Sequence, residues 1–384
     1  MNIVGGKLKT KKVKLKLKQG VIKKLKIIGV ILGILLVAYM FYCKQLSQFT
    51  ELGYSREASK KILFSEHKEY ILTVKENKTL NAAFESENFK DKYLKNYAKI
   101  SFVEHKSLIK NINKLLEKGY SNSDVSIILT HGSEEDVISF TERERVRYLE
   151  EFLNFPYAKI KYYDRYIAYT DETGEDEKTT VIHVNLNMDK KEYEDAVTEE
   201  EFSYDMLVNK FHYLEKDFIP NDLVEVSEDY RGGTEAVLAN RTAVNAVIQM
   251  IESARIDGLE LVVNSSYRSH ADQVEIAEFY RKWYGDSYVE NYIAKPGYSE
   301  HQTGLAFDMG SKKSKTFAES KEYEWIVENA HKYGFIARFT KRGQSITGYR
   351  SEPAHFRYVG KEIAEYIYKN KITFEEYYVM FLDK

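Results

Sequence analysis

Scarcity of cysteine is the first feature of this 384-residue chain, which has one cysteine and four prolines. Because Cys43 stands alone, no intrachain disulfide can form, and the fold must depend on its apolar core. The chain also lacks an overall excess of charge, with a formal net charge of −2, but its charges are unevenly placed. Residues 1–26 hold ten lysines and no acid, so the remainder carries a formal charge of −12. The length allows two or three domains.

Charge is also missing from Ile27–Cys43, a run of seventeen mostly apolar residues. That length is just enough to cross a bilayer as a helix. Aromatic residues gather at its far end, at Tyr39, Phe41 and Tyr42, where their rings favour the membrane interface. The lysines before the span favour a cytoplasmic N-terminus. We therefore predict a basic cytoplasmic tail at 1–26, a transmembrane anchor at 27–43, and a single-pass cell-membrane protein whose remaining chain is extracellular.

Two other interpretations of this apolar segment stay open. A cleaved signal peptide has small residues at the cut, and a lipoprotein site has a small residue before its cysteine. The sequence Tyr42-Cys43-Lys44-Gln45 matches neither pattern. The lysine-rich tail could bind nucleic acid, but its place beside an apolar span favours anionic lipid. We expect the cell membrane as a partner and no nucleic acid.

Residues 44–165 are mostly helical in pattern and contain short segments that recur within the region. Gly53-Tyr54-Ser55 recurs as Gly119-Tyr120-Ser121, and the Tyr-Ala-Lys-Ile of residues 97–100 recurs at residues 157–160. Serine is a favoured N-cap, and an acidic residue follows each serine near the expected first turn. This predicts a helical region with two degenerate repeats, with chance similarity as the alternative. Residues 166–206 are interpreted as a linker, in which β-branched Thr179–Asn185 predicts a strand.

Residues 207–384 differ from the preceding chain in their mixed helix and strand pattern, and are predicted to form one domain. Apolar periodicity predicts helices over residues 236–256, 271–283, 322–332 and 360–369. Strands are expected over residues 259–263, 304–309 and 355–359. Helices and strands mix without a regular βαβ order, which indicates an α+β fold.

Two stretches of this last domain concentrate the chemistry. The segment 299–308 contains His301 and Asp308, and the segment 352–355 contains Glu352 and His355. Two imidazoles and one carboxylate are a typical three-ligand zinc set that leaves a position open for water. Such a site carries a net charge of +1, which acidifies bound water and polarises a substrate carbonyl. A second carboxylate beside the ligands can take the proton of that water.

Three ordered motifs in this domain resemble those of the VanY-type D-alanyl-D-alanine carboxypeptidases. They are Ser265-Ser266-Tyr267-Arg268-Ser269, the pattern Ser299-x-His301-x-x-Gly304-x-Ala306-x-Asp308, and the segment from Glu352 to Gly360. These enzymes belong to zinc peptidase family M15, together with the VanX dipeptidases and the bacterial L,D-carboxypeptidases. The resemblance covers about residues 207–382. It implies an α+β zinc peptidase domain with a small antiparallel sheet flanked by helices.

The resemblance also implies a role for each matching residue. His301, Asp308 and His355 match the zinc ligands, and Glu352 matches the general base that activates water. Arg268 matches the arginine that stabilises the developing oxyanion. Gln273 and Ser299 match positions that hydrogen-bond the end of the peptide. Arg357 and Tyr358 are expected to brace the strand that carries His355.

The sequence departs from its relatives at two positions. Ala354 stands where relatives usually have tryptophan, and Phe339 stands where they often have tyrosine. Neither change removes a ligand or the base. The expected function is a membrane-anchored zinc carboxypeptidase that removes terminal D-alanine from peptidoglycan stem peptides, with no obligate protein partner. An inactive or weakly active peptidoglycan-binding module and a zinc endopeptidase are the alternatives.

Overall fold

The computed structural model describes residues 19–74, 76–194 and 196–383. These residues form two compact units, the first ending at Arg145 and the second beginning at Val146. Most of the predicted basic tail, residues 1–18, lies outside the described residues.

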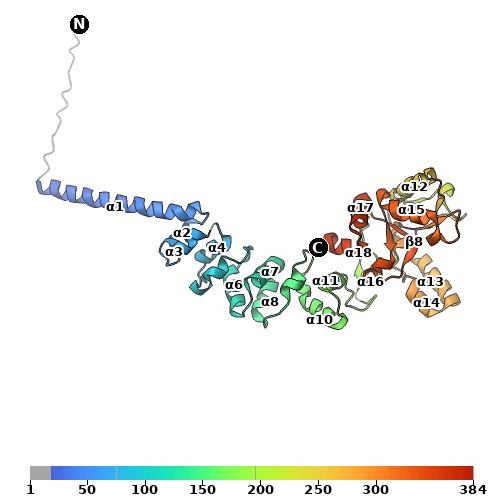
Figure 1. Ribbon diagram of the computed structural model, residues 1–384, viewed down its shortest axis with the longest axis horizontal. Coiled ribbons are helices and arrows are strands. Elements are labelled where there is room, and N and C mark those ends of the chain that lie inside the picture. Colours follow the sequence, from blue (N-terminus) through green and yellow to red (C-terminus); the bar gives the residue numbers. More distant parts are fainter. Residues whose placement is uncertain (1–18, 75, 195, 384) are drawn as a thin grey trace, which may run out of the picture. The chain divides into compact units, whose positions relative to one another are not determined.

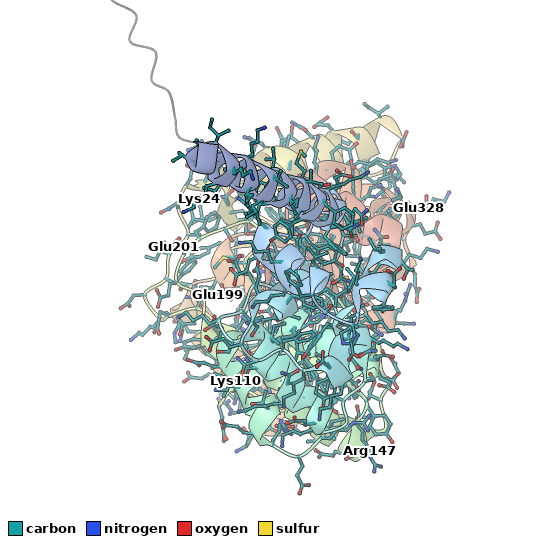
Figure 2. All side chains as sticks on the ribbon, turned by 90° about the vertical axis from the view of Figure 1, so that its left-hand side faces the viewer. Lys24, Lys110, Arg147, Glu199, Glu201 and Glu328 are labelled. Atoms are coloured by element: carbon teal, nitrogen blue, oxygen red, sulfur yellow. The ribbon has the colours of Figure 1, made fainter. Side chains whose placement is uncertain are left out.

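The first unit is entirely helical in its described part. Its longest element, α1 (Gln19–Glu51), begins before the predicted span and continues beyond it. Residues 20–51 are long and apolar enough to cross a membrane or to serve as a signal sequence. Side chains project around the whole circumference of this helix, including Lys24 near its start, and those of residues 20–41 are exposed (Figure 2). An apolar helix without a covering core is typical of a segment that contacts lipid.

Shorter helices follow α1 within the first unit. They are α2 (Arg56–Leu63), α3 (Lys68–Thr73), α4 (Lys78–Glu85), α5 (Leu94–Tyr97), α6 (Leu108–Glu117), α7 (Asn122–His131) and α8 (Glu134–Glu142). The two Gly-Tyr-Ser segments fold alike, because each glycine has a positive φ and each tyrosine is buried. Ser55 caps α2 and Ser121 caps α7 through hydrogen bonds from backbone N–H groups. The predicted helix starts are therefore confirmed, whereas the repeat itself stays a prediction.

The second unit begins with three more helices. These are α9 (Leu149–Leu153), α10 (Tyr163–Thr173) and α11 (Glu177–Asn185), so helical structure crosses residue 165, where the linker was expected. The predicted strand at Thr179–Asn185 is wrong, because this stretch lies in α11. Asp176 caps the helix by accepting a hydrogen bond from the Thr179 N–H, and all six residues from 180 to 185 are buried. Packing on all sides thus outweighs the strand preference of its β-branched residues.

A four-stranded antiparallel sheet forms the centre of the second unit. Its order is β5 (Leu261–Ser265), β6 (Ala306–Ser311), β8 (Glu352–Tyr358) and β7 (Phe335–Phe339). Two small pairs accompany it: β1 (Val197–Thr198) is parallel to β2 (His212–Tyr213), and β3 (Leu223–Glu225) is antiparallel to β4 (Leu238–Asn240). Helices and a small antiparallel sheet confirm the predicted α+β architecture.

Helices α12 (Arg241–Ile256) and α15 (Lys321–Asn329) cover one face of this sheet (Figure 1). Their apolar side chains form a buried core with alternate residues of the strands, including Phe307 of β6 and Phe356 of β8. Because side chains alternate along a strand, Asp308 and His355 point to the opposite face. The core therefore fixes which residues reach the site.

The remaining helices surround that opposite face and the sheet edges. They are α13 (His270–Tyr284), α14 (Asp286–Tyr292), α16 (Gln344–Thr347), α17 (Lys361–Asn370) and α18 (Phe374–Tyr377). The helix predicted over residues 236–256 starts later, at Arg241, because Leu238–Asn240 pairs with β3 and Asn240 caps the helix. The expected helices at 271–283, 322–332 and 360–369 and strands at 259–263, 304–309 and 355–359 are confirmed within a few residues.

Candidate metal centre and active site

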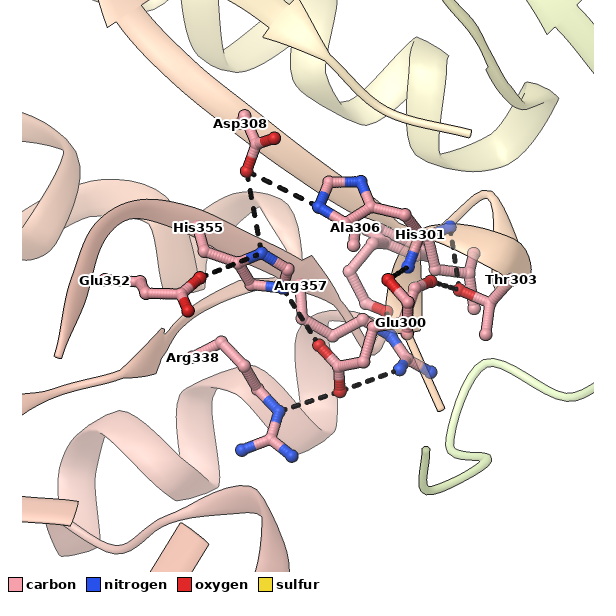
Figure 3. Close-up of polar contacts among 12 residues, drawn as sticks. Glu300, His301, Thr303, Ala306, Asp308, Arg338, Glu352, His355 and Arg357 are labelled. Atoms are coloured by element: carbon pink, nitrogen blue, oxygen red, sulfur yellow. Dashed lines mark hydrogen bonds and ion pairs between the residues drawn. The ribbon is translucent and has the colours of Figure 1, made fainter. Parts of the chain in front are cut away.

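Three elements bring the predicted ligands together. Asp308 on β6 pairs directly with His355 on β8, so both side chains leave the same face of the sheet. His301 lies in a 3₁₀ turn, Glu300–Thr303, that immediately precedes β6. The turn begins at Ser299, whose hydroxyl oxygen accepts a hydrogen bond from the His301 N–H, and it ends at Gly304 with φ +66°. A short turn and one cross-strand pair therefore fix all three side chains (Figure 3).

The candidate ligand atoms lie close enough together to share one metal ion. One Asp308 carboxylate oxygen, Oδ1, lies 3.5 Å from His301 Nε2 and 3.6 Å from His355 Nδ1. All three ligand atoms lie within 4.8 Å of one another. Ligands about 2.0–2.1 Å from a tetrahedral ion are about 3.4 Å apart, so the two distances to Asp308 match those expected in a zinc site.

The outward nitrogen of each histidine has its own partner. His301 Nδ1 lies 2.6 Å from the Ser266 carbonyl oxygen, and His355 Nε2 lies 3.1 Å from a Glu300 carboxylate oxygen. Each contact fixes the ring orientation and leaves the other nitrogen directed at the shared centre. This pattern of a carbonyl or carboxylate behind a histidine is typical of metal ligands.

The pKa values of the two histidines are shifted in opposite directions by their surroundings. Burial and the nearby Arg268 cation lower the pKa of His301 to about 4, so its imidazole is neutral. Burial alone would lower the pKa of His355, but hydrogen bonds with Asp308 and Glu300 raise it to about 9. The pKa of Asp308 is held well below its usual value, against burial, by His301 and His355. A metal ion that binds here displaces a proton from His355.

Glu300 is the centre of a buried ionic network that the sequence analysis did not identify. One of its carboxylate oxygens accepts hydrogen bonds from Arg338 Nε at 2.8 Å and Arg357 Nη1 at 3.1 Å. Arg338 also forms a bidentate pair with Glu375, with N–O distances of 2.8 and 2.5 Å. All four side chains are buried. The position of Glu300 directly before His301 was the sequence signal that could have identified it as part of the site.

Arg357 braces the strand as predicted and also orients Glu300. Its Nη2 donates to the Met206 carbonyl at 2.9 Å and to the Tyr204 carbonyl at 3.3 Å. A break in the pairing register between Ala337 and Phe339 lets both Arg338 and Phe339 reach the site face of β7. Phe339 packs beside the His355 ring with centroids 5.0 Å apart.

The predicted base and oxyanion-stabilising residue flank the ligands. Glu352 begins β8, and its Oε2 lies 3.9 Å from His355 Nδ1. Partial burial raises the pKa of the Glu352 carboxyl, with the His355 and Arg268 cations acting against this rise. Arg268 follows β5, and its Nη2 lies 3.7 Å from Asp308 Oδ2. Both side chains border the metal centre without occupying a ligand position.

A cavity of about 280 Å³ opens beside these residues, and Gln273 and Ser299 line it. The buried Gln273 amide donates to the Ala294 carbonyl at 2.8 Å, while its Oε1 has no partner among the described residues. Arg268 Nε and the Tyr349 hydroxyl also have no hydrogen-bond partner among the described residues, and both residues line the cavity. Buried polar atoms without partners are costly, so water or a polar ligand in the cavity would stabilise these three atoms.

Tyr349 is a further cavity residue that the sequence analysis missed. Its ring packs on Phe339 with centroids 4.8 Å apart, three residues before Glu352. A hydroxyl group is thus present in the cavity although Phe339 itself has none. Ala354, the other departure from relatives, contributes only a methyl group next to His355.

Comparison with known proteins places this site in a family. Residues 237–361 match the family model described as VanY, D-alanyl-D-alanine carboxypeptidase. YodJ of Bacillus subtilis is 37% identical over 179 residues, which cover 45% of this chain and 66% of YodJ. The bifunctional D-Ala-D-Ala dipeptidase and carboxypeptidase VanXYC of Enterococcus gallinarum is 34% identical over 182 residues, covering 45% of this chain and 92% of VanXYC.

A solved structure of a vancomycin-resistance VanY D,D-pentapeptidase in complex with Zn(II) is 31% identical, with a TM-score of 0.39. The aligned region covers 45% of this chain and 98% of the VanY chain in that structure. The residues that match the family model include the segments that carry the three candidate ligands and the neighbouring carboxylate Glu352. Because residues 237–361 match the family model and the chain covers 92% of VanXYC at 34% identity, it belongs to the VanY-type D-alanyl-D-alanine carboxypeptidase family.

Proposed function

We propose that this protein is a membrane-anchored, zinc-dependent carboxypeptidase that releases the terminal D-alanine of peptidoglycan stem peptides. The observation that carries the proposal is the convergence of a zinc-compatible donor set, a neighbouring carboxylate and unpartnered polar atoms in one small cavity. His301, Asp308 and His355 would hold the metal. Zinc, when bound, supplies a Lewis acid that polarises the scissile carbonyl and acidifies water.

The protein's own residues perform the proton transfers and the positioning. Glu352 takes a proton from the attacking water while the water oxygen adds to the scissile carbonyl carbon. The same carboxyl group then returns the proton to the leaving amine as the C–N bond breaks. Arg268 stabilises the negative charge that develops on the carbonyl oxygen, because its guanidinium is a cation that lines the cavity beside Asp308.

The dimensions of the cavity favour cleavage at the end of a peptide. A volume of about 280 Å³ is at the lower limit for small-molecule sites and suits one or two terminal residues. The Gln273 carbonyl oxygen can accept from a substrate N–H, while the Tyr349 hydroxyl and Arg268 Nε can donate to a carboxylate or carbonyl. An endopeptidase would need a longer cleft.

Mass spectrometry of defined muropeptides tests this proposal. Full-length protein in detergent, loaded with zinc, should remove one alanine from a pentapeptide, a tetrapeptide or both, and chelation should abolish the release. Loss from the pentapeptide alone indicates a D,D-carboxypeptidase, whereas loss from the tetrapeptide indicates an L,D-enzyme. A D-amino acid oxidase assay identifies the stereochemistry of the released alanine. Zinc binding without release from either substrate would favour a peptidoglycan-binding module instead.

Membrane anchoring gives a separate prediction. If residues 27–43 are an uncleaved anchor, protein extracted from membranes should keep the mass of the full 44.9 kDa chain. Protease added to intact protoplasts should degrade the unit beginning at Val146, because ten lysines hold the N-terminus in the cytoplasm. Intact-mass spectrometry and immunoblotting measure both results. A chain that begins after residue 43, or one lipidated at Cys43, would contradict the anchor.

A further inference from the structure

Helices α13 and α14 contact each other (Figure 1) and both carry residues that line the catalytic cavity. Six of their aromatic side chains form a continuous cluster. Neighbouring rings have centroids 4.8–6.4 Å apart throughout the cluster. We call this set the aromatic hairpin surface; it consists of Phe279, Tyr280, Trp283, Tyr284, Tyr288 and Tyr292.

The surface is exposed at its outer end and reaches the active site at its inner end. Phe279, Trp283 and Tyr284 are 57%, 66% and 62% exposed. Tyr280 and Tyr292 instead line the catalytic cavity. Exposed aromatic groups of this extent are unfavourable in water and mark a surface that binds something.

The charge and chemistry of the hairpin restrict the class of molecule that this surface can bind. Residues 270–292 contain five acidic side chains and only Arg281 and Lys282 as cations, a formal charge of −3. A negative surface disfavours an anionic membrane, which attracts basic segments. Four of the six rings carry hydroxyl groups, so the surface combines apolar faces with hydrogen-bonding groups. Sugars match this combination, because their rings present C–H faces and peripheral hydroxyls.

Distances along the hairpin match the geometry of a stem peptide on its sugar. Ile276 lines the cavity, and Tyr284 lies eight residues later on the same helix, about 12 Å along its axis. Three or four extended residues between the scissile bond and the sugar span about 10–14 Å. A peptide with its end in the cavity can therefore bring its sugar to the exposed rings.

We propose that the aromatic hairpin surface binds the glycan strand of peptidoglycan, an uncharged β-linked chain of N-acetylated amino sugars. This inference rests on the proposed function, since it assigns a second part of the same substrate to a surface continuous with the cavity. Phe279 and Trp283 make the outer contact, and Tyr280 and Tyr292 join that contact to the catalytic cavity.

The first test compares two substrates that share one peptide. Full-length protein should release alanine with a higher kcat/KM from pentapeptide on uncrosslinked glycan strands than from free pentapeptide. The double variant Phe279→Ser and Trp283→Ser should lose at least about tenfold on the strand-attached peptide and keep its rate on free pentapeptide. Neither residue lines the cavity. Ile219→Ser with Ile256→Ser, two other exposed apolar residues of the same unit, is the matched control and should change neither rate.

The second test measures binding without catalysis. The chain has two tryptophans, so Trp325→Phe leaves Trp283 as the single tryptophan reporter. Uncharged oligomers of β-linked N-acetylglucosamine, which reproduce the glycan backbone without the lactyl carboxylates that peptide removal exposes, should change its fluorescence saturably. Absence of that change with normal alanine release would overturn the inference and leave the proposed function intact. A saturable change without alanine release from either substrate would contradict the proposed function alone.

Three further outcomes would overturn the inference. The serine pair could lower both rates equally, which would indicate a structural role. Trp283 could respond to neutral phosphatidylcholine vesicles and not to the N-acetylglucosamine oligomers, which would indicate a membrane surface. Sedimentation could show a dimer that the serine pair dissociates, which would indicate contact with a second copy.

Discussion

Replacing Glu352 with glutamine is expected to lower kcat for alanine release by about 10²–10⁴-fold, the usual contribution of a positioned general base. The amide keeps the size of the side chain but cannot take a proton from water. Glu352 lies 3.9 Å from His355 Nδ1 and is not one of the three clustered ligands. The variant should therefore retain its zinc, which separates loss of the base from loss of the metal.

Kinetics on a muropeptide that the native protein cleaves, with metal content measured on the same sample, test this prediction. The exposed Glu328→Gln on α15 is the matched control and should keep the native rate. A decrease of less than tenfold would remove Glu352 from the role of base. A parallel loss of zinc would instead indicate that the carboxylate helps to hold the metal.

Replacing Arg338 with methionine is expected to destabilise the second unit by about 3–5 kcal/mol, because it leaves buried carboxylates without their cation. Arg338 is fully buried between Glu300 and Glu375 and bonds to both. For a unit of this size the loss corresponds to a decrease in Tm of about 6–20 °C. Zinc affinity should also fall by about 10–100-fold, since Glu300 orients the His355 ring.

Thermal unfolding in the presence of chelator isolates the effect on the fold. Adding Glu375→Leu to Arg338→Met should recover much of the lost stability, because one Arg357 cation then remains for one Glu300 carboxylate. The exposed Arg342→Met provides a control that should leave Tm unchanged. An unchanged Tm in Arg338→Met, or no recovery in the double variant, would contradict the proposed charge balance.

The sequence by itself determined the candidate metal ligands, because they lie in short, local motifs. His301 and Asp308 are seven residues apart, and Glu352 and His355 are three residues apart. Only one further association, the pairing of β6 with β8, was needed to join them. Apolar periodicity likewise predicted α13 and α17, since burial of one helix face leaves a regular pattern.

The tertiary structure decided the features that depend on contacts between distant residues. Arg338 is 38 positions from Glu300 and meets it only because β7 lies beside β8, so no local pattern predicts the network. The stretch Thr179–Asn185 became a helix because burial on all sides outweighed its local preference. The aromatic hairpin surface emerged only when the fold placed α13 and α14 beside the cavity. Local chemistry is thus written in the sequence, whereas burial and the partners of charged groups depend on the packing of the whole chain.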